Sequence, residues 1–196
     1  MDELISLVRR ELQTRGWLLL SIDGRCGCGK STLAAALAEA LGGNVFHSDD
    51  FYLPFARRGE GWQERVAGNM DLSRLREEVL LPLRAGEAVR YRAYDCPNDR
   101  FLPTRALPFL PLSIVEGSYS QHPLLRELYD LRLFVTAPPA VQRERLRRRE
   151  GEHFPAFEAL WIPMEERYFA AFSIPEKADF LVETGEESQR RFAKMP

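Results

Sequence analysis

The chain has 196 residues, of which 45% are hydrophobic and 29% charged, so it is long enough for one globular domain with a sizeable core. Its 27 basic and 29 acidic residues leave a formal net charge of −2. This near-balance argues against a general binder of nucleic acid or of membrane surfaces. The basic residues are almost all arginines, because lysine occurs only at Lys30, Lys177 and Lys194.

The first half of the chain predicts helices alternating with short strands. Apolar residues at helical spacing predict a helix over 2–15, and the apolar run 17–22 predicts a buried strand. A helix over 31–41 and a strand over 44–47 follow, and 53–69 has the composition of a long loop. The next helix is expected over 71–84, with Asp71 as its N-cap.

The second half continues the alternation. An edge strand is expected over 89–94, an irregular proline-rich stretch over 97–111, and buried strands over 112–115 and 131–136. Helices are expected over 140–149 and 154–172, the second with a kink or boundary at Pro163, before a last strand over 180–182 and a polar tail. The pattern predicts an α/β fold, a three-layer sandwich around a mainly parallel sheet of about five strands.

No apolar stretch is long enough to span a bilayer, and the N-terminus has no apolar block typical of a secretory signal. The three cysteines suggest neither a disulfide framework nor a zinc site. We therefore expect a soluble, cytoplasmic protein with a single domain over residues 1–196 and with neither nucleic acid nor membrane as a partner. A homo-oligomer stays open.

The strongest motif is GRCGCGKS at positions 24–31, which matches the phosphate-binding pattern G-x-x-x-x-G-K-[ST]. It lies between a predicted strand and a predicted helix, so its backbone amides and the helix N-terminus would face a polyphosphate. Lys30 would contact the β- and γ-phosphates, and the Ser31 hydroxyl would coordinate Mg²⁺. The expected nucleotide-binding residues are Gly24, Arg25, Cys26, Gly27, Cys28, Gly29, Lys30, Ser31 and Thr32.

Carboxylates follow two other predicted strands. Asp49 and Asp50 come after the second strand, and Glu116 ends the strand over 112–115. A carboxylate at this edge of an open α/β sheet can accept a proton from an attacking hydroxyl or hold Mg²⁺, so Asp49 and Glu116 are the expected metal ligands with Ser31.

The basic helix over 140–149 supplies the expected cations. Arg145 and Arg149 are four positions apart on one helical face and could reach the transferring phosphate. Together with Lys30 and Asp49 they form the expected catalytic set.

With these pieces placed, the sequence resembles the uridine kinase and phosphoribulokinase-like group of P-loop kinases over about residues 18–182. The segments that carry the resemblance are SIDGRCGCGKSTLA, HSDDFYLP, YRAYDCPNDR and IVEGSYSQHPLLRELYDLRLFV. In that group the carboxylate of the D-x-F-Y segment is the catalytic base and helps to hold Mg²⁺, which implies Asp49 with Asp50 beside it. The glutamate of the E-G segment lies near the metal, which implies Glu116.

The resemblance also implies an acceptor region over about 53–105 and a phosphate-closing lid over about 140–153. The Tyr-Asp segment of the group contacts the nucleoside, which implies Tyr94 and Asp95. Tyr52 and Asn69 complete the expected acceptor-binding residues, together with Asp50 and Glu116. Asn69 marks a departure, because the stretch 67–71 reads AGNMD where uridine kinases carry an Asp-His-Pro-Asp-containing segment. A base-contacting histidine after Tyr-Asp is also missing. This sequence thus matches the phosphate-transfer residues of the uridine kinases better than it matches their pyrimidine pocket.

We therefore expect a kinase that transfers the γ-phosphoryl of ATP, with Mg²⁺, to a hydroxyl of a nucleoside-like acceptor, with adenine near residues 183–185. One alternative is a nucleoside monophosphate kinase, which would need arginines for an acceptor phosphate. The candidates for that role are Arg57, Arg58, Arg65, Arg92 and Arg100. The other alternative is a P-loop ATPase or switch without a small acceptor. ATP and GTP are not distinguished.

Overall fold

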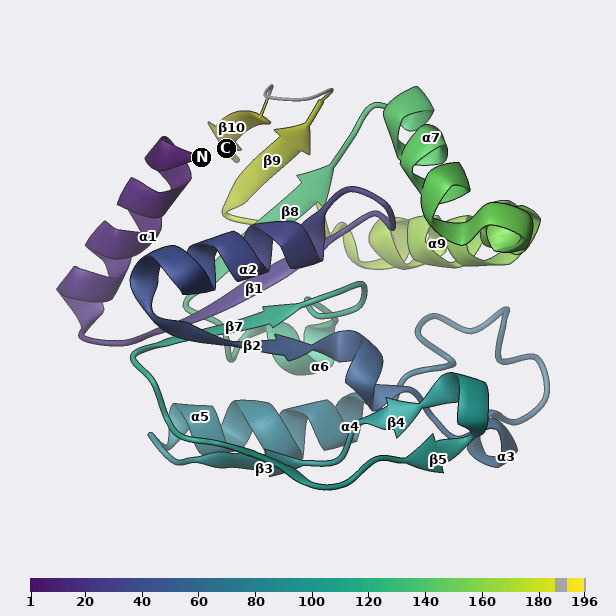
Figure 1. Ribbon diagram of the computed structural model, residues 1–196, viewed down its shortest axis with the longest axis horizontal. Helices are drawn as coiled ribbons and strands as arrows, with labels where there is room; N and C mark the ends of the chain where they lie inside the picture. Colours follow the sequence, from purple (N-terminus) through teal and green to yellow (C-terminus); the bar gives the residue numbers. More distant parts are fainter. Residues whose placement is uncertain (186–189, 196) are drawn as a thin grey trace.

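A six-stranded sheet in the order β10-β9-β8-β1-β7-β2 forms the centre of the molecule (Figure 1). The computed structural model describes residues 1–185 and 190–195. The strands are β1 (Leu18–Gly24), β2 (Gly43–His47), β7 (Leu112–Glu116), β8 (Leu131–Thr136), β9 (Phe180–Thr184) and β10 (Arg190–Lys194). Neighbours pair in parallel except β10, which runs antiparallel to β9. The predicted α/β class with a mainly parallel sheet is confirmed.

The sixth strand, β10, corrects the expectation of five strands and a polar tail. Its sequence is mostly polar, because an edge strand is held by backbone pairing and needs little apolar surface. Its apolar contribution is Phe192, whose ring stacks on Phe180 of β9 with the centroids 4.7 Å apart.

Alternating side chains of β1 divide the core between the two faces of the sheet. Leu18, Leu20 and Ile22 face helices α1 (Asp2–Arg15) and α2 (Lys30–Leu41), and all three are fully buried. Leu19 points into the opposite cluster, with Phe46 of β2. Because β1 is buried on both faces, its sequence from Leu18 to Ile22 is mostly apolar rather than alternating.

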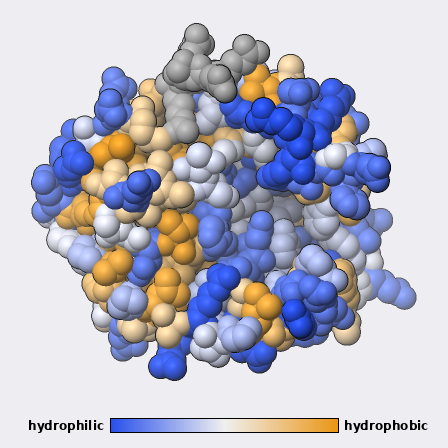
Figure 2. Space-filling view, viewed as in Figure 1, coloured by the Kyte–Doolittle hydropathy of each residue, from blue (hydrophilic) through white to orange (hydrophobic). Residues whose placement is uncertain are grey.

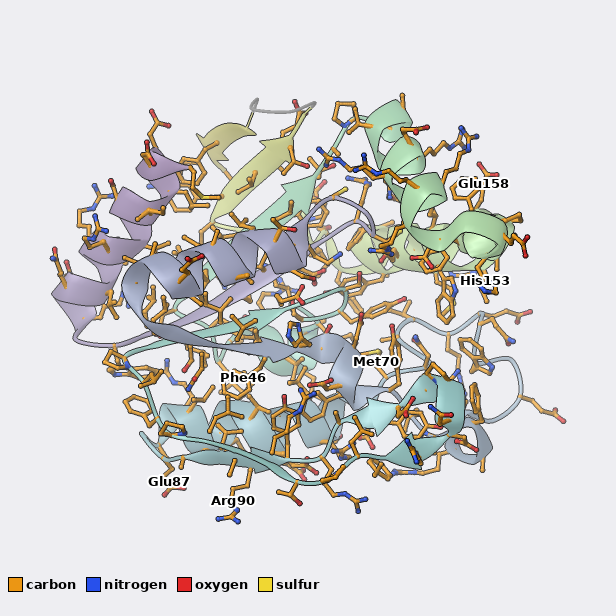
Figure 3. The ribbon with its side chains drawn as sticks, viewed as in Figure 1. Phe46, Met70, Glu87, Arg90, His153 and Glu158 are labelled. Carbon is orange, nitrogen blue, oxygen red and sulfur yellow. The ribbon has the colours of Figure 1, made fainter. Side chains whose placement is uncertain are left out.

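The second face is covered by a helix over residues 72–84, by α6 (Pro123–Arg126) and by α9 (Ile162–Phe172) (Figure 1). The first of these comprises α4 (Leu72–Leu75), a π-helical turn η2 (Arg76–Leu80) and α5 (Leu81–Arg84), and Asp71 caps it by accepting a hydrogen bond from the Arg74 amide. Phe46 points from β2 toward this helix (Figure 3). The predicted helix and cap are confirmed.

The acceptor region contains more strand than the sequence predicted. Strand β3 (Val89–Tyr91) pairs with β6 (Arg105–Leu107), and β4 (Tyr94–Asp95) pairs with β5 (Arg100–Phe101). The expected edge strand over 89–94 is therefore two short strands outside the main sheet, and the stretch 97–111 is not irregular throughout. Prolines on either side of these short strands hide their pairing from a periodicity argument. Two short helices, α3 (Phe55–Arg58) and η3 (Cys96–Asn98), complete the region.

The lid and the last helix form a continuous run from α7 (Pro139–Glu150) to α9. Between them lie η4 (Gly151–His153), α8 (Phe154–Ala156) and a π-helical turn η5 (Phe157–Trp161). The kink or boundary expected at Pro163 coincides with the junction between the π-helical turn and α9, and Pro163 lies in the first turn of α9. Among the described residues, no helix is both long and apolar enough to cross a membrane.

Candidate active site

The phosphate loop connects the carboxyl end of β1 to the first turn of α2. Gly24 begins it with φ 142°, and a Cβ there would lie 2.0 Å from the carbonyl oxygen of Val135 in the neighbouring strand β8. Only glycine fits this position, because both the backbone conformation and the contact exclude a side chain. Lys30 and Ser31 follow at the N-terminus of α2, so the loop amides and the helix end face the same space.

Two carbonyl oxygens of the phosphate loop hold the Lys30 ammonium in place. Its Nζ donates to the carbonyl oxygens of Gly24 at 2.7 Å and Arg25 at 3.0 Å. Burial lowers the pKa of Lys30, but the negative charges of Glu165, Asp23 and other nearby groups outweigh it, so the net pKa is raised. The ammonium therefore stays charged beside the loop, as a phosphate-binding cation must.

Asp23, directly before the loop, fixes the end of β1. Its carboxylate accepts hydrogen bonds from the Gly24 amide at 2.7 Å, the Gln121 amide at 2.9 Å and the Tyr168 hydroxyl at 2.7 Å. The side chain is fully buried, and burial raises the pKa of Asp23 to about 6 despite these bonds and the charge of Lys30. This carboxylate ties the loop to α9.

A cleft of about 1400 Å³ lies at the carboxyl end of the sheet, and Figure 2 shows this face hollowed beside the hydrophilic lid. The volume exceeds that of a typical single-ligand pocket and is sufficient for a nucleotide and a small acceptor together. The predicted residues that line it are Cys26, Gly27, Cys28, Gly29, Lys30, Ser31, Thr32, Asp49, Tyr52, Asn69, Glu116, Arg145 and Arg149.

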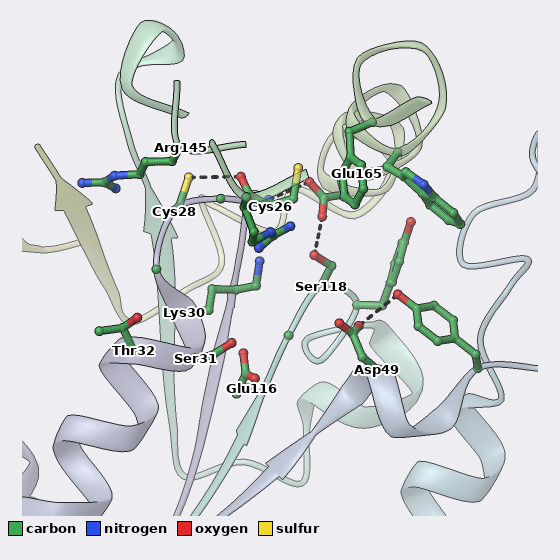
Figure 4. Close-up of a pocket in the computed structure, with 18 of the residues that line it drawn as sticks. Cys26, Cys28, Lys30, Ser31, Thr32, Asp49, Glu116, Ser118, Arg145 and Glu165 are labelled. Carbon is green, nitrogen blue, oxygen red and sulfur yellow. Dashed lines mark hydrogen bonds between the residues drawn. The ribbon is translucent and has the colours of Figure 1, made fainter. Parts of the chain in front are cut away.

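Asp49 and Glu116 face the phosphate loop from neighbouring strands (Figure 4). Asp49 opens the 3₁₀ turn η1 (Ser48–Phe51) after β2, and its Oδ1 accepts a hydrogen bond from Tyr52 Oη at 3.1 Å. The Asp49 side chain is exposed at the cleft. Desolvation and the charge of Glu116 raise the pKa of Asp49 above its usual range, although Lys30 and Tyr52 oppose the shift.

Glu116 ends β7 opposite His47 of β2, and the two strands are in register at this pair. The His47 Nδ1 and Glu116 Oε1 atoms are 2.5 Å apart, and this hydrogen bond raises the pKa of His47. His47 was not predicted as part of the site, because only the strand register shows that it reaches Glu116.

The two predicted lid arginines both line the cleft. Arg145 donates to Thr184 Oγ1 at 2.8 Å and to the carbonyl oxygen of Gly185 at 2.5 Å, which places it against the end of β9. Arg149 pairs with Glu150 at 2.5 Å and is half exposed. Arg148 lines the cleft as well and was not singled out from the sequence.

Glu165 on α9 is the main site residue that no sequence pattern indicated. Its Oε2 accepts from the Cys26 amide at 2.9 Å and its Oε1 accepts from Ser118 Oγ at 2.5 Å (Figure 4). The next residue, Glu166, pairs with Arg25 at 2.5 Å, so Arg25 points to α9 and does not line the cleft. No motif marks these contacts, which join residues 47 to 141 positions apart.

Three predicted acceptor residues lie outside the cleft. The Asp50 Oδ2 accepts from Tyr91 Oη at 2.8 Å and from Arg105 at 2.9 Å. Tyr94 donates to Asp99, and Asp95 caps η3 and bonds Asn98. The cleft instead extends to the expected acceptor region. We call this part of the cleft the acceptor end, and it is lined by Tyr52, Phe55, Arg58, Asn69, Cys96 and Pro97.

The residues present fit a magnesium ion at the phosphate loop. Mg²⁺ in such sites is held by one or two carboxylates, a hydroxyl and the substrate phosphates, and Ser31, Asp49 and Glu116 supply those protein groups along one cleft. Among the residues that the structure describes, no group of three or more His, Cys, Asp or Glu side chains forms a metal cage of its own.

Comparisons with known proteins place the fold. No family model matches the sequence, and no curated protein matches it. Among solved structures, a possible uridine kinase from Bacillus stearothermophilus matches with a TM-score of 0.68 and 22% identity, over 91% of this chain and 98% of that one. A proposed fructose transport system kinase from Silicibacter sp. TM1040 matches with a TM-score of 0.65 and 24% identity, over 79% and 85% of the two chains.

The chain therefore has the fold of the P-loop kinases. Within that class its arrangement is similar to that of the uridine kinase-like members, as the motifs had indicated.

Proposed function

We propose that the protein is an ATP-dependent kinase that transfers the γ-phosphoryl group to a hydroxyl of a small, nucleoside-like acceptor. The observation that carries the proposal is that the phosphate loop with Lys30 and the carboxylate Asp49, whose pKa is raised, line one cleft. The two similar structures, described as a possible uridine kinase and a proposed fructose transport system kinase, support the same class of reaction.

In the proposed step the acceptor hydroxyl oxygen forms a bond to the γ-phosphorus, and the bond from that phosphorus to the β,γ-bridging oxygen breaks. The electron pair leaves with ADP. Asp49 accepts the hydroxyl proton, and its raised pKa makes its carboxylate a stronger base than an ordinary aspartate. Lys30 and the loop amides stabilise the negative charge on the phosphates.

Ser31, Asp49 and Glu116 are the residues that would hold Mg²⁺ with the nucleotide. The ion supplies charge neutralisation on the phosphate oxygens when it is bound. Because His47 is hydrogen bonded to Glu116 at 2.5 Å, it positions that carboxylate from the neighbouring strand.

The lid arginines complete the charge balance around the transferring group. Arg145 is anchored at Thr184 and Gly185, which also line the cleft, so it borders the end where we place the adenine ring. Arg149 and Arg148 lie further along the same helix and are the cations nearer to solvent. We assign them to closing over the phosphates.

The test is ADP formation from ATP and Mg²⁺ in the presence of a panel of nucleosides, nucleoside monophosphates and pentose derivatives. A rate that one acceptor stimulates would establish a kinase and identify the acceptor. A rate that is the same with every compound and without any would overturn the kinase proposal in favour of an ATPase or switch. A parallel series with GTP tests the choice of donor.

A further inference from the structure

The acceptor end of the cleft contains a buried cation that lacks a carboxylate partner. Arg58, the last residue of α3, is 4% exposed and lines the cleft. No carboxylate lies within ion-pair distance of it in residues 1–185 or 190–195. A buried guanidinium without an anion is costly, so proteins seldom keep one unless a partner arrives.

The hydrogen bonds of Arg58 use only part of its capacity. Its Nε donates to the Leu53 carbonyl oxygen at 2.9 Å, and its Nη2 donates to the Cys96 Sγ at 2.9 Å. The rings of Phe55 and Trp62 flank the guanidinium, with centroids 4.2 and 5.1 Å from its Cζ. These neutral contacts orient the side chain. They leave Nη1 without a partner, and this nitrogen is not among the unpaired atoms that protein fully encloses.

The other arginines that could have bound an acceptor phosphate are engaged elsewhere. Arg57 pairs with Asp71 at 3.3 Å, and Arg100 pairs with Asp95 at 3.4 Å. Arg65 and Arg92 donate to backbone carbonyl oxygens, and none of the four lines the cleft. The structure thus selects Arg58 from the five candidates.

The surrounding wall adds no negative charge at this end. Asn69 is 1% exposed, and neither its amide nitrogen nor its amide oxygen has a hydrogen-bond partner. The acidic residues that line the cleft are Asp49, Glu116 and Glu165, and all three belong to the phosphate-loop end described above. The acceptor end therefore combines one cation with an unpartnered neutral amide.

We propose that the acceptor carries an anionic group, a carboxylate or a phosphate, which Arg58 binds while the acceptor hydroxyl reaches Asp49. The inference rests on the proposed function, because it names the chemical class of the acceptor for the same cleft. A guanidinium with a free Nη1 edge recognises either anion through charge-assisted hydrogen bonds. The Asn69 side chain keeps this part of the wall neutral, whereas a carboxylate in its place would repel the anion.

Cys96 provides a test that does not depend on turnover. Its thiol contacts Arg58 and is half-buried, so an anion bound at Arg58 would shield it from a small neutral alkylating reagent. The protein is saturated with a non-hydrolysable ATP analogue and Mg²⁺, and the alkylation rate of Cys96 is followed by mass spectrometry with and without inorganic phosphate. Acetate replaces phosphate in a second arm to distinguish the two anions, and chloride at equal ionic strength is the control.

We expect phosphate or acetate to slow alkylation roughly fivefold at ~50 mM, which corresponds to a Kd of about 10 mM for such a fragment. Arg58→Gln should abolish the protection. Arg90→Gln, which removes an exposed arginine of β3 that points away from the molecule, should retain it (Figure 3). No protection by either anion in the wild-type protein, or equal protection in wild type and Arg58→Gln, would overturn the inference.

Asn69→Asp is the second variant, and it keeps the result decisive if Arg58→Gln does not fold. The new carboxylate would neutralise the charge of Arg58 and repel added anions, although the side chain has almost the same shape. Protection by added anions should therefore be lost.

The acceptor panel then separates the anionic-acceptor proposal from the kinase proposal. Anionic acceptors should exceed matched neutral ones about 100-fold in kcat/KM, a preference lost in Arg58→Gln. Turnover that favours neutral acceptors would support the kinase proposal and contradict the proposal of an anionic acceptor. An acceptor-independent rate together with protection by anions would contradict the kinase proposal and support an anion-binding site at Arg58.

Discussion

Glu165 of α9 accepts a hydrogen bond from the backbone amide of Cys26 in the phosphate loop, at 2.9 Å and across 139 positions of sequence. The same carboxylate accepts from Ser118, so it connects the helix that follows the lid to the loop and to the turn after β7. It also places a negative charge close to Lys30, where nucleotide phosphates would bring more. Glu165 therefore stabilises the phosphate loop when no nucleotide is bound, and its negative charge disfavours the binding of nucleotide phosphates.

This dual role gives the first prediction. Glu165→Gln keeps an oxygen that can accept from the Cys26 amide but removes the charge, so we expect ATP to bind several-fold more tightly. Glu165→Ala loses both hydrogen bonds and should lower the free energy of unfolding by about 2 kcal/mol. Calorimetric titration with ATP and urea unfolding measure the two effects. Weaker ATP binding by the Gln variant would mean that Glu165 helps to hold the nucleotide instead.

Lys30→Ala should abolish ATP turnover, with a loss of at least about 100-fold in kcat, because the cation on the β- and γ-phosphates is removed. The fold should persist, since within residues 1–185 and 190–195 the ammonium donates hydrogen bonds only to the carbonyl oxygens of Gly24 and Arg25. The measurement is ADP release together with a thermal melt. A variant that no longer melts cooperatively would show that Lys30 is needed for folding as well as for phosphate binding.

Asp49→Asn should reduce the chemical step about 100-fold or more while ATP binding changes little, because the base is lost and the phosphate loop is intact. Single-turnover kinetics and nucleotide titration separate the two. Equal losses in chemistry and in ATP binding would make Asp49 a metal ligand first.

The pH dependence of the rate distinguishes Asp49 from Asp50. The rate should rise with pH as the base loses its proton, and the Tyr52 hydrogen bond lowers the pKa of Asp49. Tyr52→Phe removes that bond, so the acid limb of the pH–rate profile should move to higher pH. Tyr91→Phe removes the matched hydrogen bond to Asp50 and should leave the limb in place. A shift with Tyr91→Phe alone would assign the base to Asp50.

Asp23 predicts a pH dependence of stability. Its pKa is raised from 3.8 to about 6 in the folded protein. Between these values the unfolded chain has released the proton and the folded protein still holds it, so this group makes folding less favourable as pH rises from 4 to 6. Above pH 6 the penalty is constant, at about 3 kcal/mol at most.

Asp23→Asn isolates that contribution. The free energy of unfolding of the wild type, relative to the variant, should fall between pH 4 and pH 6 and then stay level. Urea unfolding at several pH values gives the difference directly. A difference that rises over this interval would mean that the three hydrogen bonds to Asp23 outweigh its burial.

The sequence was informative where chemistry and backbone geometry depend on the same local motif. The phosphate loop needs Gly24, Lys30 and Ser31 in fixed order between a strand and a helix, and all of that is local. The parallel sheet followed from apolar runs of suitable length. By contrast, Glu165 and His47 reach the site through packing and strand register, which no local pattern encodes.

In the acceptor region the sequence did not predict which side chains face the cleft. Asp50 is adjacent to Asp49, yet in the turn η1 its side chain lies outside the cleft and bonds Tyr91. Tyr94 and Asp95 were expected at the acceptor because a resemblance carries residue order and not side-chain direction; both make local contacts in the β4–β5 hairpin instead. Arg58 stood among five candidates until burial and pairing separated it from the rest.

The indole rings of Trp62 and Trp161 lie 6.0 Å apart, and Arg167 of α9 donates to the Gln63 carbonyl oxygen at 2.6 Å. The segment before Asn69 and the run that follows the lid thus touch each other beside the cleft, which Trp161 lines. Two of the chain's three tryptophans therefore lie beside the cleft. We expect a ligand that enters the cleft to change the intrinsic tryptophan fluorescence, which a titration without any dye would measure.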